Sequence, residues 1–264
     1  MRGRPVAPTA FAVPLSQPSP AAVHLLCVPY AGGGAAVFRH WPALLPPTLA
    51  VSAIRLPGRE SRIGEPPLAD IGQMVTAAAD DLAADTATDR PYALFGHSFG
   101  ALVAFELARE MRARDLPAPR RLFVSAHRAP DADAGTAPLG DLSDQEFLDK
   151  VTRYGGMPQE VLDAPDLLDM VLPALRADID AAEGYRFVPG APLNCPISVF
   201  GGRSDSVTPQ AQLYGWRSHS VAEVDVRLFD GGHFFLHDHR TAVTTTIGAA
   251  LGALPDGAAP GATP

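Results

Sequence analysis

Pro91-Tyr-Ala-Leu-Phe-Gly-His-Ser-Phe-Gly-Ala-Leu-Val-Ala-Phe-Glu-Leu-Ala108 is the stretch of the chain that most constrains its fold. Its first five residues form a short apolar run suited to a buried strand, and residues 101–108 have the composition of a strong helix. Between them, Gly96-His-Ser-Phe-Gly100 matches the pattern Gly-x-Ser-x-Gly, in which a serine stands on a tight turn from strand to helix. The pattern is weak alone, but its setting predicts a strand, a turn that presents Ser98, and a helix.

Short apolar runs alternate with helical patterns on both sides of this unit. Alternation of strands and helices predicts an α/β fold, with a mostly parallel central sheet, helices on both faces, and a site in the loops at the strand carboxyl ends. The runs that we expect to be buried parallel strands are 23–28, 49–54, 92–95, 121–125, 197–200 and 224–229. The expected helices are 71–82, 101–112, 209–216 and 242–251.

The alternation breaks after Ser125, which indicates an insertion in one large domain. Residues 142–185 have apolar side chains at helical spacing and no convincing strand. We therefore expect a helical insertion at about 131–188 that covers the site as a lid; an extra pair of core-packing helices is the alternative. The domain itself is expected over residues 21–251. Residues 1–20 and 252–264, rich in Pro, Ala and Gly, are expected to be loose tails.

Two further loops supply the groups that a serine needs to react. A serine becomes an effective nucleophile when a base removes its proton and a carboxylate orients that base. Asp205 ends the loop Gly201-Gly-Arg-Ser-Asp205, and His233 ends the loop Asp230-Gly-Gly-His233; each loop follows a predicted strand. The order serine, acid, histidine is the one expected for a serine on such a turn. We predict Ser98 as nucleophile, His233 as base and Asp205 as the orienting acid.

Other carboxylates and histidines compete for these roles. The rival acids are expected to be surface or turn residues: Asp178, Asp180, Asp225 and Asp230. His97 is expected to pack beside the site, and the remaining rivals to be structural or solvated: His24, His40, His127 and His219. The spacing of His233, His237 and His239 permits a metal alternative, but the glutamate of a zinc-protease helix is missing. No metal is expected.

Backbone amides at two places can stabilise a developing oxyanion. The amide of Phe99 is expected at a helix N-terminus, where an unpaired N–H and the helix dipole favour negative charge. The glycine-rich loop Pro29-Tyr-Ala-Gly-Gly-Gly34 follows the first buried strand and can turn its backbone inward, most plausibly with the amide of Ala31. Such a loop could instead cradle a phosphate, but it lacks the spacing and the lysine of the known phosphate-binding motifs.

The charge and composition of the chain limit the kinds of partner that it can bind. The net charge is −8, and residues 131–188 hold 13 acids against four basic residues, a balance of −9, so the remainder sums to +1. Neither part has the basic excess that binding of nucleic acid requires. No apolar run is long enough for a membrane span, and prolines break the apolar residues near the N-terminus, so we expect a cytoplasmic protein. Two cysteines without metal-site spacing, Cys27 and Cys195, are expected to be buried and unpaired.

Taken together, these segments resemble the type II thioesterases, the stand-alone editing enzymes of polyketide and nonribosomal peptide synthases, which have the α/β-hydrolase fold. The matching segments run in order over residues 23–240: Pro29-Tyr-Ala-Gly-Gly-Gly-Ala35 with Phe38 and Trp41, Leu56-Pro-Gly-Arg-Glu60, Gly96-His-Ser-Phe-Gly-Ala101, Leu175-Arg-Ala-Asp178 with Tyr185, Gly201-Gly-Arg-Ser-Asp205, and Gly231-Gly-His-Phe-Phe-Leu236. Members of the family usually have methionine where this chain has Phe99. Because the role implied at this position belongs to the backbone amide, we expect the phenylalanine to change the shape of the pocket but not the chemistry.

The resemblance implies hydrolysis of stalled or aberrant acyl groups from the phosphopantetheine arm of carrier proteins. The catalytic roles fall on Ser98, Asp205 and His233, and the oxyanion amides on Ala31 and Phe99. No cofactor is implied, because the phosphopantetheine belongs to the carrier, which is the expected partner. The alternatives are a chain-releasing fatty acyl-carrier thioesterase, a small-ester esterase, and, in another class, a non-catalytic hydrolase-like interaction protein.

Two expectations concern how such a substrate is held. Apolar residues of the insertion are expected to line an acyl pocket: Met157, Leu162, Leu168, Met170 and Leu172. The loop 55–62 carries Arg55, Arg59 and Arg62 against Glu60 and follows a strand, so it is expected to dock an acidic carrier protein. The alternative is an ordinary solvated loop, or an arginine held in an internal ion pair. Of the three, Arg59 is the one expected to be structural, because its Pro-Gly-Arg context recurs in the family that the chain resembles.

Overall fold

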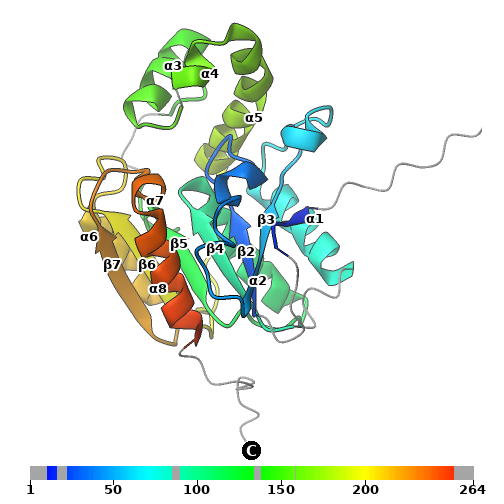
Figure 1. The fold of residues 1–264 in the computed structure, drawn as a ribbon, viewed down its shortest axis with the longest axis vertical. Coiled ribbons are helices and arrows are strands. Elements are labelled where there is room, and N and C mark those ends of the chain that lie inside the picture. Colours follow the sequence, from blue (N-terminus) through cyan, green and yellow to red (C-terminus); the bar gives the residue numbers. More distant parts are fainter. Residues whose placement is uncertain (1–10, 17–22, 85–89, 134–137, 158, 253–264) are drawn as a thin grey trace, which may run out of the picture.

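The computed structural model describes residues 11–16, 23–84, 90–133, 138–157 and 159–252, which build a seven-stranded sheet (Figure 1). The strand order is β1-β3-β2-β4-β5-β6-β7, and only β1 is antiparallel to its neighbour. The strands are β1 Ala12–Pro14, β2 Val23–Val28, β3 Leu49–Ile54, β4 Tyr92–His97, β5 Leu122–Ser125, β6 Ile197–Gly202 and β7 Val224–Phe229. The predicted mostly parallel sheet is confirmed, with β4 and β6 each two residues longer than expected.

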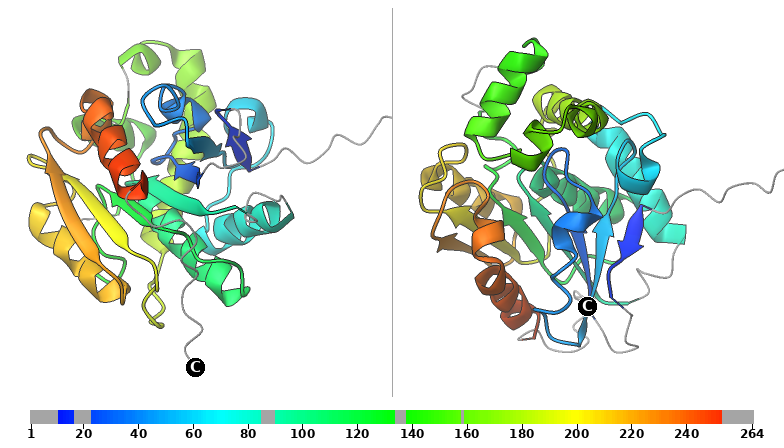
Figure 2. Two further views of the ribbon diagram at one scale, coloured as in Figure 1. Left: turned by 60° about the horizontal axis from the view of Figure 1, so that its bottom comes forward. Right: turned by 45° about the horizontal axis from the view of Figure 1, so that its top comes forward.

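Helices cover both faces of the sheet, as predicted (Figure 2). Alternate residues of the buried strands point to opposite faces, so Leu26 and Val28 pack in one core and Leu25 and Cys27 in the other. The first core is closed by α1 Ile71–Ala84, α2 Phe99–Ala113, α6 Gln210–Leu213 and the 3₁₀ helix η4 Tyr214–His219. The second is closed by the 3₁₀ helix η1 Ala35–Phe38, α7 Phe235–Asp238 and α8 Arg240–Gly252.

The expectation of a loose tail over residues 1–20 is wrong for residues 11–16. Ala12–Pro14 pairs with β3, and the amides of Phe11 and Ala12 donate to Asp81 at 2.9 and 3.2 Å. Pro14 is tolerated because β1 is an edge strand, where a missing N–H leaves no ladder bond broken. The rest of that tail, residues 1–10 and 17–20, lies outside the described residues, as does 253–264; Gly252 still belongs to α8.

The insertion between β5 and β6 is helical, as the spacing predicts. It contains α3 Asp144–Arg153, α4 Gln159–Leu162 and α5 Pro165–Gly184, and no strand among its described residues. Ser143 caps α3 with Glu146 in a reciprocal capping box, and Pro165 starts α5. The three helices lie together beyond one end of the sheet (Figures 1 and 2).

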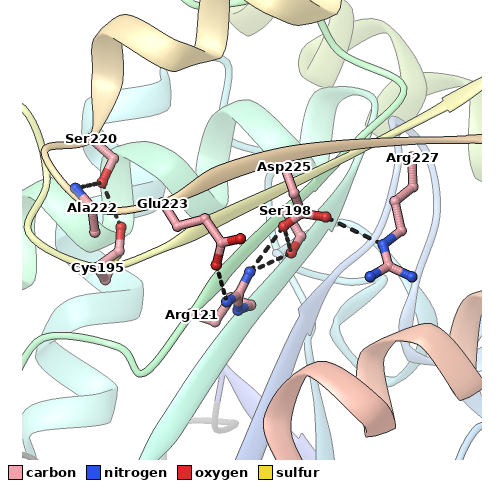
Figure 3. A network of polar contacts seen from close by, with 8 residues as sticks. All are labelled: Arg121, Cys195, Ser198, Ser220, Ala222, Glu223, Asp225 and Arg227. Atoms are coloured by element: carbon pink, nitrogen blue, oxygen red, sulfur yellow. Dashed lines mark hydrogen bonds and ion pairs between the residues drawn. The ribbon is translucent and has the colours of Figure 1, made fainter. Parts of the chain in front are cut away.

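A polar network fastens the amino ends of the last three strands (Figure 3). Arg121 donates to Ser198 Oγ at 2.8 Å and Asp225 Oδ1 at 3.0 Å, and Ser198 Oγ donates to the same Asp225 oxygen at 2.7 Å. Asp225 was expected to be a surface residue, but its side chain is only 26% exposed, because its carboxylate pairs with the buried guanidinium of Arg121. Asp230 is 80% exposed, as expected. Among the described helices, none is long and apolar enough to cross a membrane.

Candidate active site

Ser98 stands on the turn between β4 and α2, as predicted. Its backbone adopts φ 53°, a strained region for a residue with a side chain, and its amide donates to the carbonyl of Ser125 at 2.7 Å. A Cβ on Gly96 would lie 2.0 Å from the carbonyl oxygen of Gly100, and one on Gly100 would lie 2.3 Å from that of Val28. The two glycines therefore let the strands and the helix approach closely enough to hold the serine in this turn.

The structure brings the three predicted catalytic side chains together. His233 Nε2 lies 2.8 Å from Ser98 Oγ, and His233 Nδ1 lies 2.9 Å from Asp205 Oδ2. The second oxygen of Asp205 accepts hydrogen bonds from the amides of Val207 and Thr208 at 2.8 and 2.9 Å. The Asp205 side chain is fully buried and that of His233 is 6% exposed, so the acid is held where solvent cannot compete for it.

Contacts between the two loops explain how residues 28 positions apart converge. The amide of Arg203 donates to the carbonyl of Phe229, and the amide of Ser204 to that of Gly231. These bonds join the loop after β6 to the loop after β7 immediately before the catalytic positions. Because both strands run parallel, their loops leave from the same edge of the sheet and Asp205 meets His233 there.

The amides expected to form an oxyanion hole lie beside Ser98. Phe99 is the first residue of the 15-residue helix α2, and Ala31 lines the same cavity as Ser98. In the glycine-rich loop, the amide of Gly32 donates to Asp178 Oδ2 at 2.8 Å and that of Gly33 to the carbonyl of Tyr30 at 2.9 Å. The amides of Gly32 and Gly33 are thus bonded within the protein, and the oxyanion role expected for the amide of Ala31 stays a prediction.

His97 packs beside the site, as expected. Its side chain is fully buried, its Nδ1 lies 2.9 Å from Ser125 Oγ, and its ring centroid is 5.6 Å from that of His233. Burial lowers the pKa of His97 well below its ordinary value, and the charge that His233 gains on protonation lowers it further. His97 is therefore a neutral neighbour that adds no charge next to the base.

Three other histidines contact side chains outside the catalytic three. His24 contacts Ser52 Oγ at 2.7 Å, and His219 contacts Asp131 at 2.9 Å. His237 lies 3.1 Å from the hydroxyl of Tyr30. The residues that the structure describes contain no group of three or more side chains placed to hold a metal ion.

A cavity of about 350 Å³ opens at Ser98 and His233. One wall comes from the insertion, with Val151 on α3, Tyr154 directly after it, and Leu175 and Ile179 on α5. The prediction of which side chains line this cavity is wrong for all five residues. Leu162 and Leu168 line a separate surface hollow, and Met170 is 52% exposed. Met157 and Leu172 pack against a small core that α3 and α5 share. The helices were predicted correctly, but their faces toward the cavity were not.

The expected docking surface is contradicted for two of its three arginines. Arg59 is 5% exposed and pairs with Asp178, and Arg62 is 6% exposed and pairs with Glu65 at 2.6 Å while its guanidinium lies 4.2 Å from the centre of the Phe11 ring. Arg55 is half-buried, and its Nε finds no partner among the described residues. Arg59 and Arg62 are therefore bound within the fold and cannot form the expected basic patch, while the docking role predicted for Arg55 is not tested.

Asp178 is likewise not the surface residue that was expected. It is fully buried and receives both terminal nitrogens of Arg59, at 2.7 and 2.8 Å, besides the amide of Gly32. Burial raises the pKa of Asp178, and the hydrogen bonds and charge of Arg59 oppose that rise. The sequence contained one clue to this residue, since Asp178 and Arg59 both lie in segments that carry the resemblance.

Comparison with known proteins agrees with this geometry. Residues 23–251 match the family model described as the thioesterase domain. The chain belongs to the thioesterase family. Over 222 residues it is 36% identical to the gramicidin S biosynthesis protein GrsT of Aneurinibacillus migulanus, covering 84% of this chain and 86% of that one. The predicted resemblance is confirmed.

Solved structures of other thioesterases extend the likeness to three dimensions. The thioesterase RedJ from the prodiginine biosynthetic pathway of Streptomyces coelicolor is 37% identical, with a TM-score of 0.83 over 94% of this chain and 91% of that one. BorB, the type II thioesterase of the borrelidin biosynthetic cluster, is 35% identical, with a TM-score of 0.83 over 91% of this chain and 97% of that one. This thioesterase is thus a serine hydrolase of the α/β-hydrolase fold.

Proposed function

We propose that this thioesterase hydrolyses acyl thioesters on the phosphopantetheine arm of carrier proteins, and so removes aberrant or stalled acyl groups from a polyketide or nonribosomal peptide synthase. The observation that carries the proposal is the hydrogen-bonded chain Ser98–His233–Asp205 beside a cavity lined by apolar side chains together with Lys150 and Glu183. The relatives GrsT, RedJ and BorB, which carry biosynthetic names, support the biological setting.

The first half of the reaction acylates the serine. His233 Nε2 takes the proton of Ser98 Oγ, and the oxygen attacks the thioester carbonyl. Asp205, bonded to Nδ1, stabilises the imidazolium that forms and keeps Nε2 free to accept the proton. The amides of Phe99 and Ala31 hold the oxyanion of the tetrahedral intermediate, a role that side-chain changes at position 99 leave intact.

The second half releases the acid and restores the enzyme. The intermediate collapses as His233 returns the proton to the departing pantetheine sulfur, which leaves an acyl group on Ser98. A water molecule, deprotonated by the same histidine, then attacks the ester carbonyl, and collapse of the second intermediate gives the free acid. Every step uses groups of this chain, the carrier's own phosphopantetheine and water.

The helices α3 and α5 act in this proposal as a lid over the cavity. Side chains of both helices line it, Lys150 and Val151 from α3 and Leu175, Ile179 and Glu183 from α5, so their position sets the length and shape of acyl group that fits. The proposal also includes a cytoplasmic location, which the two buried, unpaired cysteines support.

A substrate panel tests the proposal. Purified protein is given short-acyl and long-acyl carrier proteins, the matching pantetheine thioesters and a nitrophenyl ester, with the Ser98→Ala variant as control. We expect the highest kcat/KM on short acyl-carrier substrates and a loss of about 10³-fold or more in the variant. Preference for long acyl-carriers would instead identify a fatty acid chain-releasing enzyme, preference for the free ester an esterase, and no turnover together with no fluorophosphonate labelling of Ser98 a non-catalytic protein.

A further inference from the structure

Asp178 and Arg59 form a buried clamp on the glycine-rich loop that carries Ala31. Asp178 Oδ2 accepts the Gly32 amide at 2.8 Å, and Arg59 Nη1 donates to the Gly33 carbonyl at 3.1 Å while it also bonds to that same Asp178 oxygen. The clamp therefore holds one donor and one acceptor of the two residues that follow Ala31. The peptide that carries the Gly32 amide also carries the carbonyl of Ala31, so its orientation limits where the Ala31 amide can point.

A second contact from the same strand-following loop fixes the far side of the turn. Glu60, next to Arg59, accepts the amide of Ala36 at 2.9 Å. Gly32 has φ 73°, and a Cβ on it would lie 3.2 Å from the side chain of Leu175. The loop thus has contacts with residues 59–60 and with α5, and little freedom remains for the turn.

The clamp also connects the oxyanion loop to the wall of the cavity. Asp178 lies on α5 between Leu175 and Ile179, which both line the cavity with Ser98. Residues three or four positions apart on a helix share a face, so the same side of α5 contacts the cavity through Leu175 and Ile179 and the glycine-rich loop through Asp178. The acyl group and the oxyanion donor are therefore positioned by one helix.

We infer that Asp178 and Arg59 are positioning residues that set the Ala31 amide for the oxyanion of this reaction. This inference rests on the proposed function of Ala31 and Ser98. A bidentate arginine is required at position 59, because a lysine has one nitrogen and cannot reach both Asp178 oxygens and the Gly33 carbonyl. If the pair served stability alone, its loss would lower the melting temperature without a selective effect on the transition state.

The test separates transition-state binding from folding. Arg59→Lys and Asp178→Asn are compared with wild type well below their melting temperatures, using a nitrophenyl ester of a short acyl chain, a trifluoromethyl ketone that forms a tetrahedral adduct on Ser98, and the carboxylic acid product. Asp225→Asn is the matched control, since it breaks another ion pair with a buried arginine, at the opposite end of the sheet. None of these three measurements needs a carrier protein.

We expect kcat/KM for the ester to fall about 10- to 100-fold in both clamp variants, less than the roughly 10²- to 10³-fold loss on removal of one oxyanion donor, because the donor is displaced and not removed. The inhibition constant of the trifluoromethyl ketone should rise by the same factor, while that of the product acid changes less than about threefold. Asp225→Asn should leave all three constants within about threefold, even if it melts earlier. If Asp178→Asn does not fold, the milder Arg59→Lys decides.

An unchanged ketone constant in the clamp variants, or an equal rise in Asp225→Asn, would overturn the inference. Failure of wild type to bind the ketone would overturn both the inference and the proposed chemistry. Normal ketone results together with no turnover of acyl-carrier substrates would leave the positioning role supported and refute only the proposed substrate.

Discussion

Replacement of Asp205 by asparagine should move the proton of the neutral His233 ring from Nδ1 to Nε2. Asp205 Oδ1 accepts two amides, from Val207 and Thr208, so an asparagine must place its carbonyl oxygen there. The alternative orientation would set its NH₂ group against two N–H donors. With the carbonyl fixed, the NH₂ group faces His233 Nδ1, 2.9 Å away in the native protein. The histidine must then carry its proton on Nε2 and donate to Ser98 Oγ.

A histidine in that tautomer cannot accept the serine proton. The closest general case, the same substitution in a serine triad that keeps its geometry, costs about 10⁴-fold in kcat. Because Asp205 is fully buried and both oxygens have defined partners, no solvent-mediated route offsets the loss here. We therefore expect a fall of about 10³- to 10⁴-fold in kcat, or about 4–5.5 kcal/mol of transition-state stabilisation.

The assay is steady-state hydrolysis of a nitrophenyl ester, with thermal unfolding of each variant measured in parallel. Asp230→Asn is the matched control, because Asp230 precedes the same histidine loop but is 80% exposed and forms an ion pair with the exposed Arg203. It should retain kcat within about twofold. A loss of less than tenfold in Asp205→Asn, while Ser98→Ala is inactive, would refute the assignment of Asp205 as the orienting acid.

Three further predictions concern the cavity, stability and pH. Ile179→Ala should shift preference toward longer acyl esters, whereas Leu162→Ala, in a separate hollow, should not; equal profiles on an ester panel would contradict this. Arg62→Glu should lower the free energy of unfolding by about 2–3 kcal/mol in urea titrations, because it sets a second carboxylate beside Glu65, and a variant as stable as wild type would disprove it. Burial and the charge of Arg128 lower the pKa of His127 to about 4. As the pH falls, the histidine of the unfolded chain therefore takes up its proton before that of the folded chain does. The free energy of unfolding should then decrease between about pH 6.5 and about pH 4, by at most about 1.4 kcal/mol per pH unit. Urea titrations of His127→Gln should show a shallower loss, and parallel curves would exclude His127 as the cause.

Local patterns were sufficient for the six parallel strands and for the three catalytic side chains, but not for the edge strand β1. β2, β3 and β7 have the predicted bounds, because an apolar run bounded by turn residues specifies a buried strand without reference to the rest of the chain. Ser98, Asp205 and His233 each follow such a strand. Parallel strands end at one edge, so the position of a residue after its strand was enough to predict that the three would meet.

The arginines of loop 55–62 show what local patterns could not specify. Three cations near one glutamate indicate a basic surface only if the cations face solvent, and burial is decided by partners elsewhere. Arg59 is neutralised by Asp178, 119 residues away, and Arg62 is covered by Phe11 from a segment that was expected to be loose. The distant partner also explains why the prediction for Asp178 was wrong. This residue is one of 13 acids in residues 131–188 and was expected at the surface, yet it is fully buried.

The buried carboxylate also decides between the two interpretations of the glycine-rich loop. A phosphate cradle needs several amides that converge on one anion, with no competing negative charge beside them. Here the Gly32 amide is already bonded to the Asp178 carboxylate and the Gly33 amide to the Tyr30 carbonyl. A phosphate would therefore meet an anion and too few donors. In the proposed reaction a single thioester oxygen needs only the amides of Ala31 and Phe99, and Arg59 balances the Asp178 carboxylate, so these contacts favour the proposed oxyanion role of the loop over a phosphate site.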